Sequence, residues 1–258
     1  MQKDITMSAR RLSNAAMSEE ERKTRIELAA CYRLAQREGW DELIYNHISA
    51  RVPGPDHHFL INPFGLAFEE VTASNLVKVD QEGRIIGESP YPINAAGFTI
   101  HSAVHAARPE VGCVIHLHTE AGMALSMLEG GLQPLTQTAM FFHDRVAYHD
   151  YEGLALNLEE RERLVRDLGD KDVMVLKHHG LLTAGRTVAE AFHNMYYMEQ
   201  SCRLQIAATQ GGQKITVPSD SVAAHTAEQF NRHPETKGQR PWAALRRKLD
   251  RISPDYAS

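Results

Sequence analysis

Three histidines occur at a spacing that could bind a metal ion. His116 and His118 stand two apart in CVIHLH, residues 113–118, an apolar run typical of a buried strand. Because side chains alternate across a strand, both imidazoles point to one face and the intervening leucine points to the other. His179 follows a second apolar run and precedes Gly180, where a tight turn can bring a third imidazole to the same place. Three histidines without a fourth protein ligand leave one position open for water or substrate, as catalytic zinc sites do.

The same spacing also fits a simpler interpretation. Two histidines two apart on a strand are often partly exposed residues at the edge of a core, with no metal between them. The sequence contains 14 histidines, and several lie in phrases with Gly, Asp and Tyr rather than in a tag-like tract. From spacing alone, both interpretations stay open.

Composition describes a globular chain with one large core. The 258 residues are 43% hydrophobic and 24% charged, with a net charge of -5. This balance gives no broad cationic surface, so we expect neither a nucleic-acid partner nor a membrane partner. No apolar run approaches the roughly 18 to 20 residues that span a bilayer, and the first residues lack the apolar core of a secretory signal. We therefore expect a cytoplasmic protein, with Cys31, Cys113 and Cys202 as reduced core residues.

Helices and strands alternate along the chain, which predicts an α/β fold. Ser18 and Glu21 form a capping box at the start of the first helix, and HISARV alternates strictly between apolar and polar residues. An antiparallel portion is expected where LVKVD and RIIG pair around a short turn. We predict helices over residues 19–38, 95–108, 119–128, 157–169 and 187–208, and strands over 47–52, 57–61, 76–80, 84–87, 113–118 and 172–176.

The chain divides into three parts by its pattern. Residues 1–17 are an N-terminal extension, residues 18–210 carry the alternating helices and strands, and residues 211–258 form a polar, Pro-interrupted arm. A short amphipathic helix is expected within this arm over residues 242–249. We expect the arm to pack on the domain or on a neighbouring subunit.

Several phrases of the sequence resemble the class II aldolase/adducin family. They are AGFTIHSAVHAARPEVGCVIHLHTEAG and the later VLKHHGLLTAG, supported by YNHISARV, LINPFG, RVAYHDYEG and AFHNMYYME between about residues 18 and 205. The resemblance implies a three-layer α/β/α sandwich with a central mixed, largely antiparallel sheet, as in fuculose-phosphate aldolase and ribulose-phosphate epimerase. In the enzymes of this family such histidines bind zinc, which implies that His116, His118 and His179 are metal ligands. Adducin heads share the fold as cytoskeletal parts and need not keep these histidines.

The departures from the family pattern concern the substrate. The sugar-phosphate aldolases carry a catalytic acid, usually Glu, where this chain has Gly97. Their phosphate-binding Asn, turn hydroxyl and two serines correspond here to His47, Phe64, Ala95 and Ala96. A dianionic phosphate needs several hydrogen-bond donors, and most of these positions are now apolar. We therefore predict a substrate that is not a sugar phosphate.

The metal ligands that the resemblance implies predict a metal-dependent lyase, and the missing phosphate donors predict a substrate without a phosphate group. A divalent metal, Zn²⁺ or alternatively Fe²⁺ or Mn²⁺, can hold a keto or hydroxy acid and stabilise an enediolate during aldol cleavage or decarboxylation. We expect His47, Gly65 and Gly97 to contact the substrate. Tyr148 lies where the family places a tyrosine that reaches the metal site of an adjacent subunit as proton donor. His47 is the second catalytic candidate, as a carboxylate binder or a base.

Two alternatives to the lyase stay open, an Fe(II)-dependent oxygenase on the same fold and a non-catalytic adducin-like binding module. The resemblance also implies a homotetramer with the active site between subunits. Among the remaining polar residues, His101 and His105 are interpreted as helix-packing residues near the ligands. The residues that flank Tyr148 are interpreted as solvated residues of a polar loop, of which one is a candidate to line the site; they are His143, Asp144, His149 and Asp150.

Overall fold

A seven-stranded sheet forms the centre of the computed structural model, which describes residues 17–154 and 159–258. The strands lie in the order β3-β2-β1-β4-β7-β6-β5, and β5 with β6 is the parallel pair while the other pairs are antiparallel. The predicted mixed, largely antiparallel sheet is therefore confirmed. The strands are β1 (His47–Arg51), β2 (Phe59–Ile61), β3 (Val77–Val79), β4 (Cys113–Leu117), β5 (Val146–His149), β6 (Val173–Leu176) and β7 (Gly180–Gly185).

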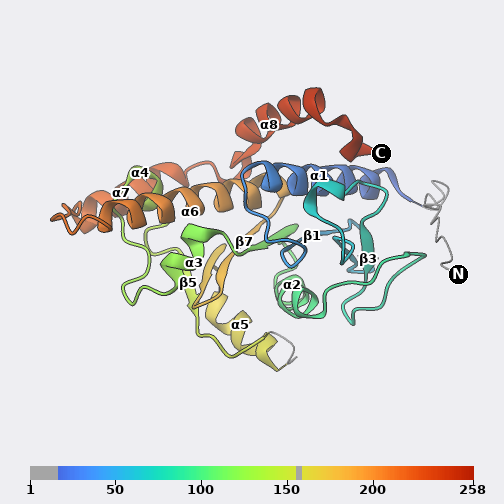
Figure 1. Cartoon of the computed structure of the whole chain (residues 1–258), viewed down its shortest axis with the longest axis horizontal. Coiled ribbons are helices and arrows are strands. Elements are labelled where there is room, and N and C mark those ends of the chain that lie inside the picture. The colour runs from blue at the N-terminus through green and yellow to red at the C-terminus, as the bar shows by residue number, and fades with distance from the viewer. Residues whose placement is uncertain (1–16, 155–158) are drawn as a thin grey trace, which may run out of the picture.

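Helices cover both faces of the sheet and give the predicted three layers. Figure 1 shows α1 and α6 on one side of the sheet and α2 and α5 on the other. The helices are α1 (Glu19–Arg37), α2 (Ala95–Ala107), α3 (Glu120–Ser126), α4 (Gln137–Met140), α5 (Glu160–Leu168), α6 (Val188–Thr209), α7 (Asp220–Phe230) and α8 (Gln239–Ile252). Short 3-10 turns occur at η1 (Phe68–Glu70), η2 (Pro234–Thr236) and η3 (Pro254–Ala257).

The alternation of β4 decides which side of the sheet its histidine faces. Ile115 and Leu117 belong to the apolar core between the sheet and α1 and α6, whereas Val114 belongs to the core beneath α2 and α5. His116 is two residues from Val114 and therefore lies on the α2 and α5 side. Each core also draws on the neighbouring strands, so the position of β4 is fixed from both faces.

Helix caps explain where several helices begin. The Ser18 hydroxyl accepts a hydrogen bond from the Glu21 amide at 3.1 Å, and Thr187 caps Glu190 in the same way. Asn94 accepts from the first amides of α2. Such caps satisfy amide groups that have no partner within the helix. The predicted helix starts near residues 19, 95 and 188 follow from these side chains.

The C-terminal segment packs on the domain of its own chain. Figure 1 shows α8 lying over α1, with the C-terminus close to the same helix. The Trp242 ring packs against Phe192 at 5.4 Å between centroids, and its indole donates to Glu27 of α1. Lys237, which is largely buried, pairs with Glu190 at 3.1 Å. The expected helix over 242–249 is longer than predicted, and α7 precedes it.

Some predicted elements differ from the structure. The predicted strand 84–87 is reduced to a single bridge between Val79 and Ile85. The strand predicted from residue 57 begins at Phe59, because His57 has a positive φ of 54° and cannot continue an extended strand. Asn157, the expected start of a helix, lies outside the described residues. The strands β5 and β7 were not predicted.

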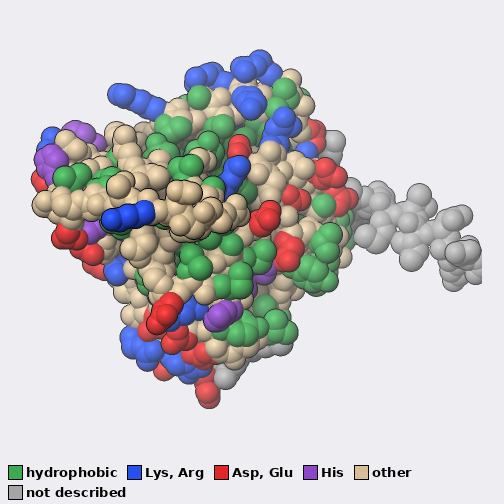
Figure 2. Space-filling model, turned by 60° about the vertical axis from the view of Figure 1, so that its left-hand side comes forward, with side chains coloured by type: hydrophobic (Ala, Val, Ile, Leu, Met, Phe, Trp, Pro, Cys, Tyr) green, Lys and Arg blue, Asp and Glu red, His purple; other side chains and the backbone are tan. Residues whose placement is uncertain are grey.

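The cysteines agree with the expectation of reduced core residues. The three cysteines are free and buried. Within the described residues, no helix combines the length and apolar character needed to cross a membrane. Figure 2 shows basic side chains gathered at the upper edge, where α8 lies, and charges of both signs mixed over the rest of this face.

Candidate metal centre

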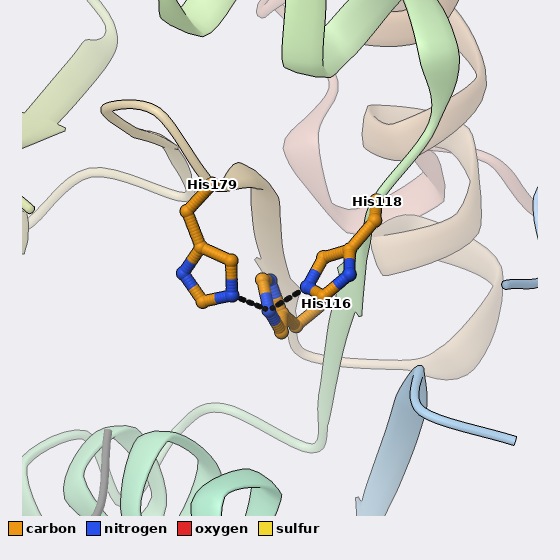
Figure 3. A group of neighbouring side chains, drawn as sticks. All are labelled: His116, His118 and His179. Carbon is orange, nitrogen blue, oxygen red and sulfur yellow. Dashed lines mark hydrogen bonds between the residues drawn. The ribbon is translucent and has the colours of Figure 1, made fainter. Parts of the chain in front are cut away.

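Three imidazoles converge at one end of β4. The Nε2 atom of His116 lies 3.2 Å from Nε2 of His118 and 3.3 Å from Nε2 of His179. Figure 3 shows His118 just beyond the end of β4 and His179 on the turn opposite, with both rings directed at His116. One ligand atom from each residue lies within 4.8 Å of the others. In the part of the chain that the structure describes, this is the one cluster of at least three candidate metal-ligating side chains.

The second nitrogen of two of these rings is held by an acceptor. His116 donates from Nδ1 to the Leu181 carbonyl at 3.0 Å, and His118 donates from Nδ1 to the Glu42 carboxylate at 2.6 Å. A carbonyl and a carboxylate can only accept, so each Nδ1 carries the proton. With its proton on Nδ1, each uncharged ring can present the Nε2 lone pair to a metal ion. Such partners orient metal-ligating histidines in proteins.

The spacing of these nitrogen atoms fits a bound cation. Two lone pairs that face each other at 3.2 Å repel unless a positive charge lies between them. Nitrogens about 2.0 to 2.1 Å from one tetrahedral zinc ion lie about 3.3 Å apart. The separations from His116 match this value. The donor set therefore fits a divalent metal held by His116, His118 and His179.

Burial keeps two of the candidate ligands neutral. It lowers the pKa of His116 well below its ordinary value, with His179, His47 and His118 adding to the effect. Burial also lowers the pKa of His179 to about 4, with a further contribution from His118. A metal ligand must be unprotonated, so the lowered pKa values favour metal binding at neutral pH.

The turn between β6 and β7 positions His179. His178 has a positive φ of 56°, and the His179 amide donates to the Leu176 carbonyl at 3.1 Å, which closes the turn tightly. A Cβ atom on Gly180 would lie 2.6 Å from the Leu117 carbonyl oxygen. Only glycine lets β7 approach β4 this closely. The His-Gly pair therefore brings the third imidazole to β4.

His47 lies beside the three histidines and fills the space next to Gly97. Its ring centroid is 5.1 Å from that of His116, and the side chain is almost fully buried. A Cβ atom built on Gly97 would lie 2.5 Å from Cδ2 of His47. The absence of a side chain at residue 97 is what lets His47 adopt this position. His47 therefore lies against His116, and Gly97 packs against the ring of His47.

A buried hydrogen-bonded chain continues from His47 away from the metal ligands. His47 Nδ1 lies 2.8 Å from His101 Nε2, and Ser49 Oγ lies 2.6 Å from His101 Nδ1 and 2.8 Å from His105 Nε2. Burial lowers the pKa of His101 well below its ordinary value and that of His105 to about 3. His101 and His105 thus hold His47 from behind, in keeping with their predicted packing role.

Tyr148 and Gly65 lie apart from the three histidines. Tyr148 shares a face of β5 with Val146, which packs against the core on the α1 and α6 side, opposite to His116. Its hydroxyl accepts from the Leu132 amide at 3.0 Å, and 38% of the residue is exposed. Gly65 is exposed in the turn after β2 with a φ of 105°. Neither residue reaches the cluster within its own chain.

Two residues near the cluster were not predicted, and a third was expected in different surroundings. Glu42 is 76 residues from His118, so no local pattern could pair them. The Tyr151 ring lies 6.3 Å from that of His179. His149 was expected in a solvated loop of which one residue was a candidate to line the site. The solvated loop is wrong, because His149 is on β5, is 3% exposed and lines a pocket with His179. The acidic residues that surround it come from α5, which the phrase YHDY could not reveal.

Comparison with known proteins decides the family. Residues 26–206 match the model of the class II aldolase and adducin N-terminal domain. The chain belongs to the class II aldolase and adducin family. An aldolase II superfamily protein from Pseudomonas syringae shares 50% identity and a TM-score of 0.89, covering 94% of this chain and 98% of that one.

Both branches of the class II aldolase and adducin family occur among the relatives. An L-fuculose 1-phosphate aldolase from Glaciozyma antarctica shares 30% identity and a TM-score of 0.80 over 92% of each chain. Mouse alpha-adducin shares 42% identity over 247 residues, covering 90% of this chain but 34% of the adducin. Family membership therefore establishes the fold, and leaves the choice between an enzyme and a binding module to the site.

Proposed function

We propose that this protein is a cytoplasmic, divalent-metal-dependent lyase that acts on a keto or hydroxy acid without a phosphate group. The observation that carries the proposal is the convergence of His116, His118 and His179, with Nε2 atoms 3.2 and 3.3 Å apart and Nδ1 atoms of two rings held by acceptors. Zn²⁺ is the preferred ion and Fe²⁺ the first alternative, because three imidazoles suit both ions. Mn²⁺ is a further alternative.

The chemistry of the site follows from neutral ligands. A divalent ion held by three uncharged imidazoles supplies positive charge that stabilises negative charge developing on a substrate oxygen. His47 forms the wall beside these ligands and is held by His101, so its ring is fixed in position. We propose that His47 and Gly97 shape the space for the substrate. Gly65, exposed in the turn after β2, is left without a role in this site.

The surroundings support a substrate without a phosphate. His47 is buried and already bonded to His101, which leaves it a poor partner for a dianion. Phe64, which stands at the position of the family's turn hydroxyl, is apolar and supplies no donor. Its ring centroid lies 6.5 Å from that of Tyr45. A keto or hydroxy acid needs fewer donors, because its paired oxygens can be bound by the metal ion.

The proposed mechanism also assigns a role to a second subunit. Tyr148 is partly exposed and lies on the face of the sheet opposite to His116. It can serve as a proton donor only at the metal centre of a neighbouring chain, which requires an oligomer with the site between subunits. We propose the homotetramer that the family resemblance implies. Light scattering tests this directly, and a monomer removes Tyr148 from the mechanism.

A substrate screen tests the proposed reaction. Protein loaded with Zn²⁺, Mn²⁺ or Fe²⁺ is incubated with a panel of 2-keto and 2-hydroxy acids, and both pyruvate and carbon dioxide are measured. We expect turnover of at least one acid, lost in His116→Ala. Efficient cleavage of a phosphorylated ketose would contradict the substrate class, and oxygen uptake by the iron form would favour an oxygenase instead.

An adducin-like binding module is the second candidate, favoured by the 42% identity to mouse alpha-adducin. A binding module has no need of a bound metal. Protein that binds no divalent ion under any loading condition would support this candidate over the lyase.

A further inference from the structure

A further buried histidine lines a pocket with His179 and is unused by the proposed mechanism. His149 ends β5 and is 3% exposed. It lines a small pocket together with His179, Tyr151 and Glu160. Its electrostatic effect is one of the causes, after burial and His118, that lower the pKa of His179. The two histidines therefore face a common space.

Asp167 of α5 fixes the orientation of the His149 ring. The Nδ1 atom of His149 lies 2.7 Å from the Asp167 carboxylate. Burial alone would raise the pKa of Asp167, but the hydrogen bonds from His149 and Arg166 outweigh burial and lower it, so the carboxylate stays ionised. An ionised carboxylate only accepts, so Nδ1 of His149 carries a proton. Serine proteases use an Asp-His pair in this way to orient a base.

The Nε2 atom of His149 is buried without a hydrogen-bond partner. The Glu160 carboxylate, which only accepts, lies 3.7 Å from this atom. If Nε2 carries no proton, its lone pair faces an acceptor and leaves a place for a proton donor. A proton taken up at Nε2 would lie between Asp167 and Glu160, whose negative charges stabilise an imidazolium ion.

The other charged groups around the pocket are paired with one another. Lys177 contacts Asp150 at 2.7 Å, and Glu152 contacts Arg163 on α5. His179 lines the same pocket, and its Nε2 atom lies 3.3 Å from Nε2 of His116, another candidate metal ligand. Among the described side chains that line this pocket, the buried polar atom left without a hydrogen-bond partner is therefore Nε2 of His149.

We propose that His149, oriented by Asp167, is the base and acid that moves protons for the lyase reaction. In cleavage, the proton of the substrate hydroxyl passes to Nε2 as the carbon–carbon bond breaks and its electron pair forms an enolate. The proton on Nε2 then passes to the enolate carbon, which restores the neutral ring. This residue would replace the family's acid at Gly97. The proposal rests on the proposed function and assigns a residue to it.

The protonation state of His149 can be measured without any substrate. In protein labelled with ¹⁵N-histidine at pH 8, the ring resonances are assigned by their loss in His149→Asn. Asparagine can keep the bond to Asp167 while removing Nε2. We expect a proton on Nδ1 and none on Nε2. A proton bound at Nε2 under these conditions overturns the proposal, because the ring then has no lone pair to accept one.

Proton exchange tests the catalytic step itself. Metal-loaded protein is incubated with pyruvate in D₂O, and loss of the methyl signal is followed by NMR. We expect His149→Asn to slow exchange by about 100-fold or more, Asp167→Asn to slow it less, and His225→Asn on exposed α7 to leave it unchanged. Metal content should be equal in all four proteins, which separates proton transfer from metal binding.

The two measurements distinguish the two proposals. If the His149→Asn protein exchanges the methyl protons of pyruvate at the wild-type rate, His149 is not the proton carrier. The proposal of a metal-dependent lyase is then unaffected. Absence of exchange in the wild type counts against the lyase acting on this keto acid, and the ring protonation state then decides on His149 alone.

Discussion

A side chain at residue 97 should collide with His47, and the size of the collision can be worked from the structure. A Cβ atom on Gly97 would lie 2.5 Å from Cδ2 and 2.7 Å from Cγ of His47. Carbon atoms prefer about 3.5 to 4.0 Å, so the ring would have to move by about 1 Å. His47 is held by its 2.8 Å bond to His101. Overpacking costs about 1 to 3 kcal/mol, and a lost buried hydrogen bond a similar amount.

We therefore expect Gly97→Ala to lower the free energy of unfolding by about 2 to 4 kcal/mol. In a His47→Ala background the ring is absent, and the same change should be neutral or stabilising by up to about 1 kcal/mol, because alanine favours the α2 helix. Urea unfolding of the four proteins gives the coupling energy. Additive effects of the two substitutions would refute the reasoning. Gly130→Ala is the control, because a Cβ atom there meets nothing closer than 3.6 Å.

Three further predictions concern the metal, acid stability and the C-terminal segment. Glu42→Ala should weaken Zn²⁺ affinity by about 10- to 100-fold, measured by competition with a chromophoric chelator. His105→Gln should reduce the loss of stability between pH 7 and pH 4, followed by urea unfolding at each pH. Trp242→Ala should lower the free energy of unfolding by about 3 to 5 kcal/mol, since the ring is 6% exposed against Phe192.

The sign of the acid effect follows from the pKa of His105. Burial lowers it to about 3, whereas an unfolded histidine has a pKa of about 6.5. Between these values the unfolded chain binds the proton and the folded protein does not, so stability falls as the pH drops through this window. The expected loss at pH 4 is about 3 kcal/mol. An unchanged pH dependence in His105→Gln would show that this residue is not responsible.

Matched surface variants control the other two predictions. Glu38→Ala removes an exposed carboxylate near Glu42 and should leave Zn²⁺ affinity unchanged. Arg240→Ala changes an exposed residue of α8 and should leave stability within about 0.5 kcal/mol. Equal effects of Glu42→Ala and Glu38→Ala would mean that charge near the site, not the bond to His118, sets the affinity. If Trp242→Ala has the same free energy of unfolding as the wild type, the packing of α8 does not stabilise the protein through this residue.

Local patterns predicted the elements that carry the candidate ligands. Alternation within residues 113–118 placed His116 and His118 on one face, and capping residues marked the helix starts. The sequence missed β5, because its run VAYH ends in polar residues that are usually exposed. It missed β7, because the phrase GLLTAG has neither strict alternation nor β-branched enrichment.

Contacts between distant segments could not be predicted. His149 is buried because Asp167 and Glu160 arrive from α5, and Glu42 reaches His118 across 76 residues. A polar residue whose partners are distant in the sequence cannot be told from a solvated residue when only its sequence neighbours are known. The resemblance to the family identified functional residues only at positions within the family's motifs.

The most direct test of the account is the metal content of the protein. Protein purified without chelators, and the same protein dialysed and reloaded with Zn²⁺, is measured by elemental analysis beside His116→Ala. We expect one divalent ion per chain in the wild type and none in His116→Ala. Wild-type protein that binds no divalent ion after reloading, or equal metal in both proteins, would contradict the assignment of His116, His118 and His179 as a metal centre.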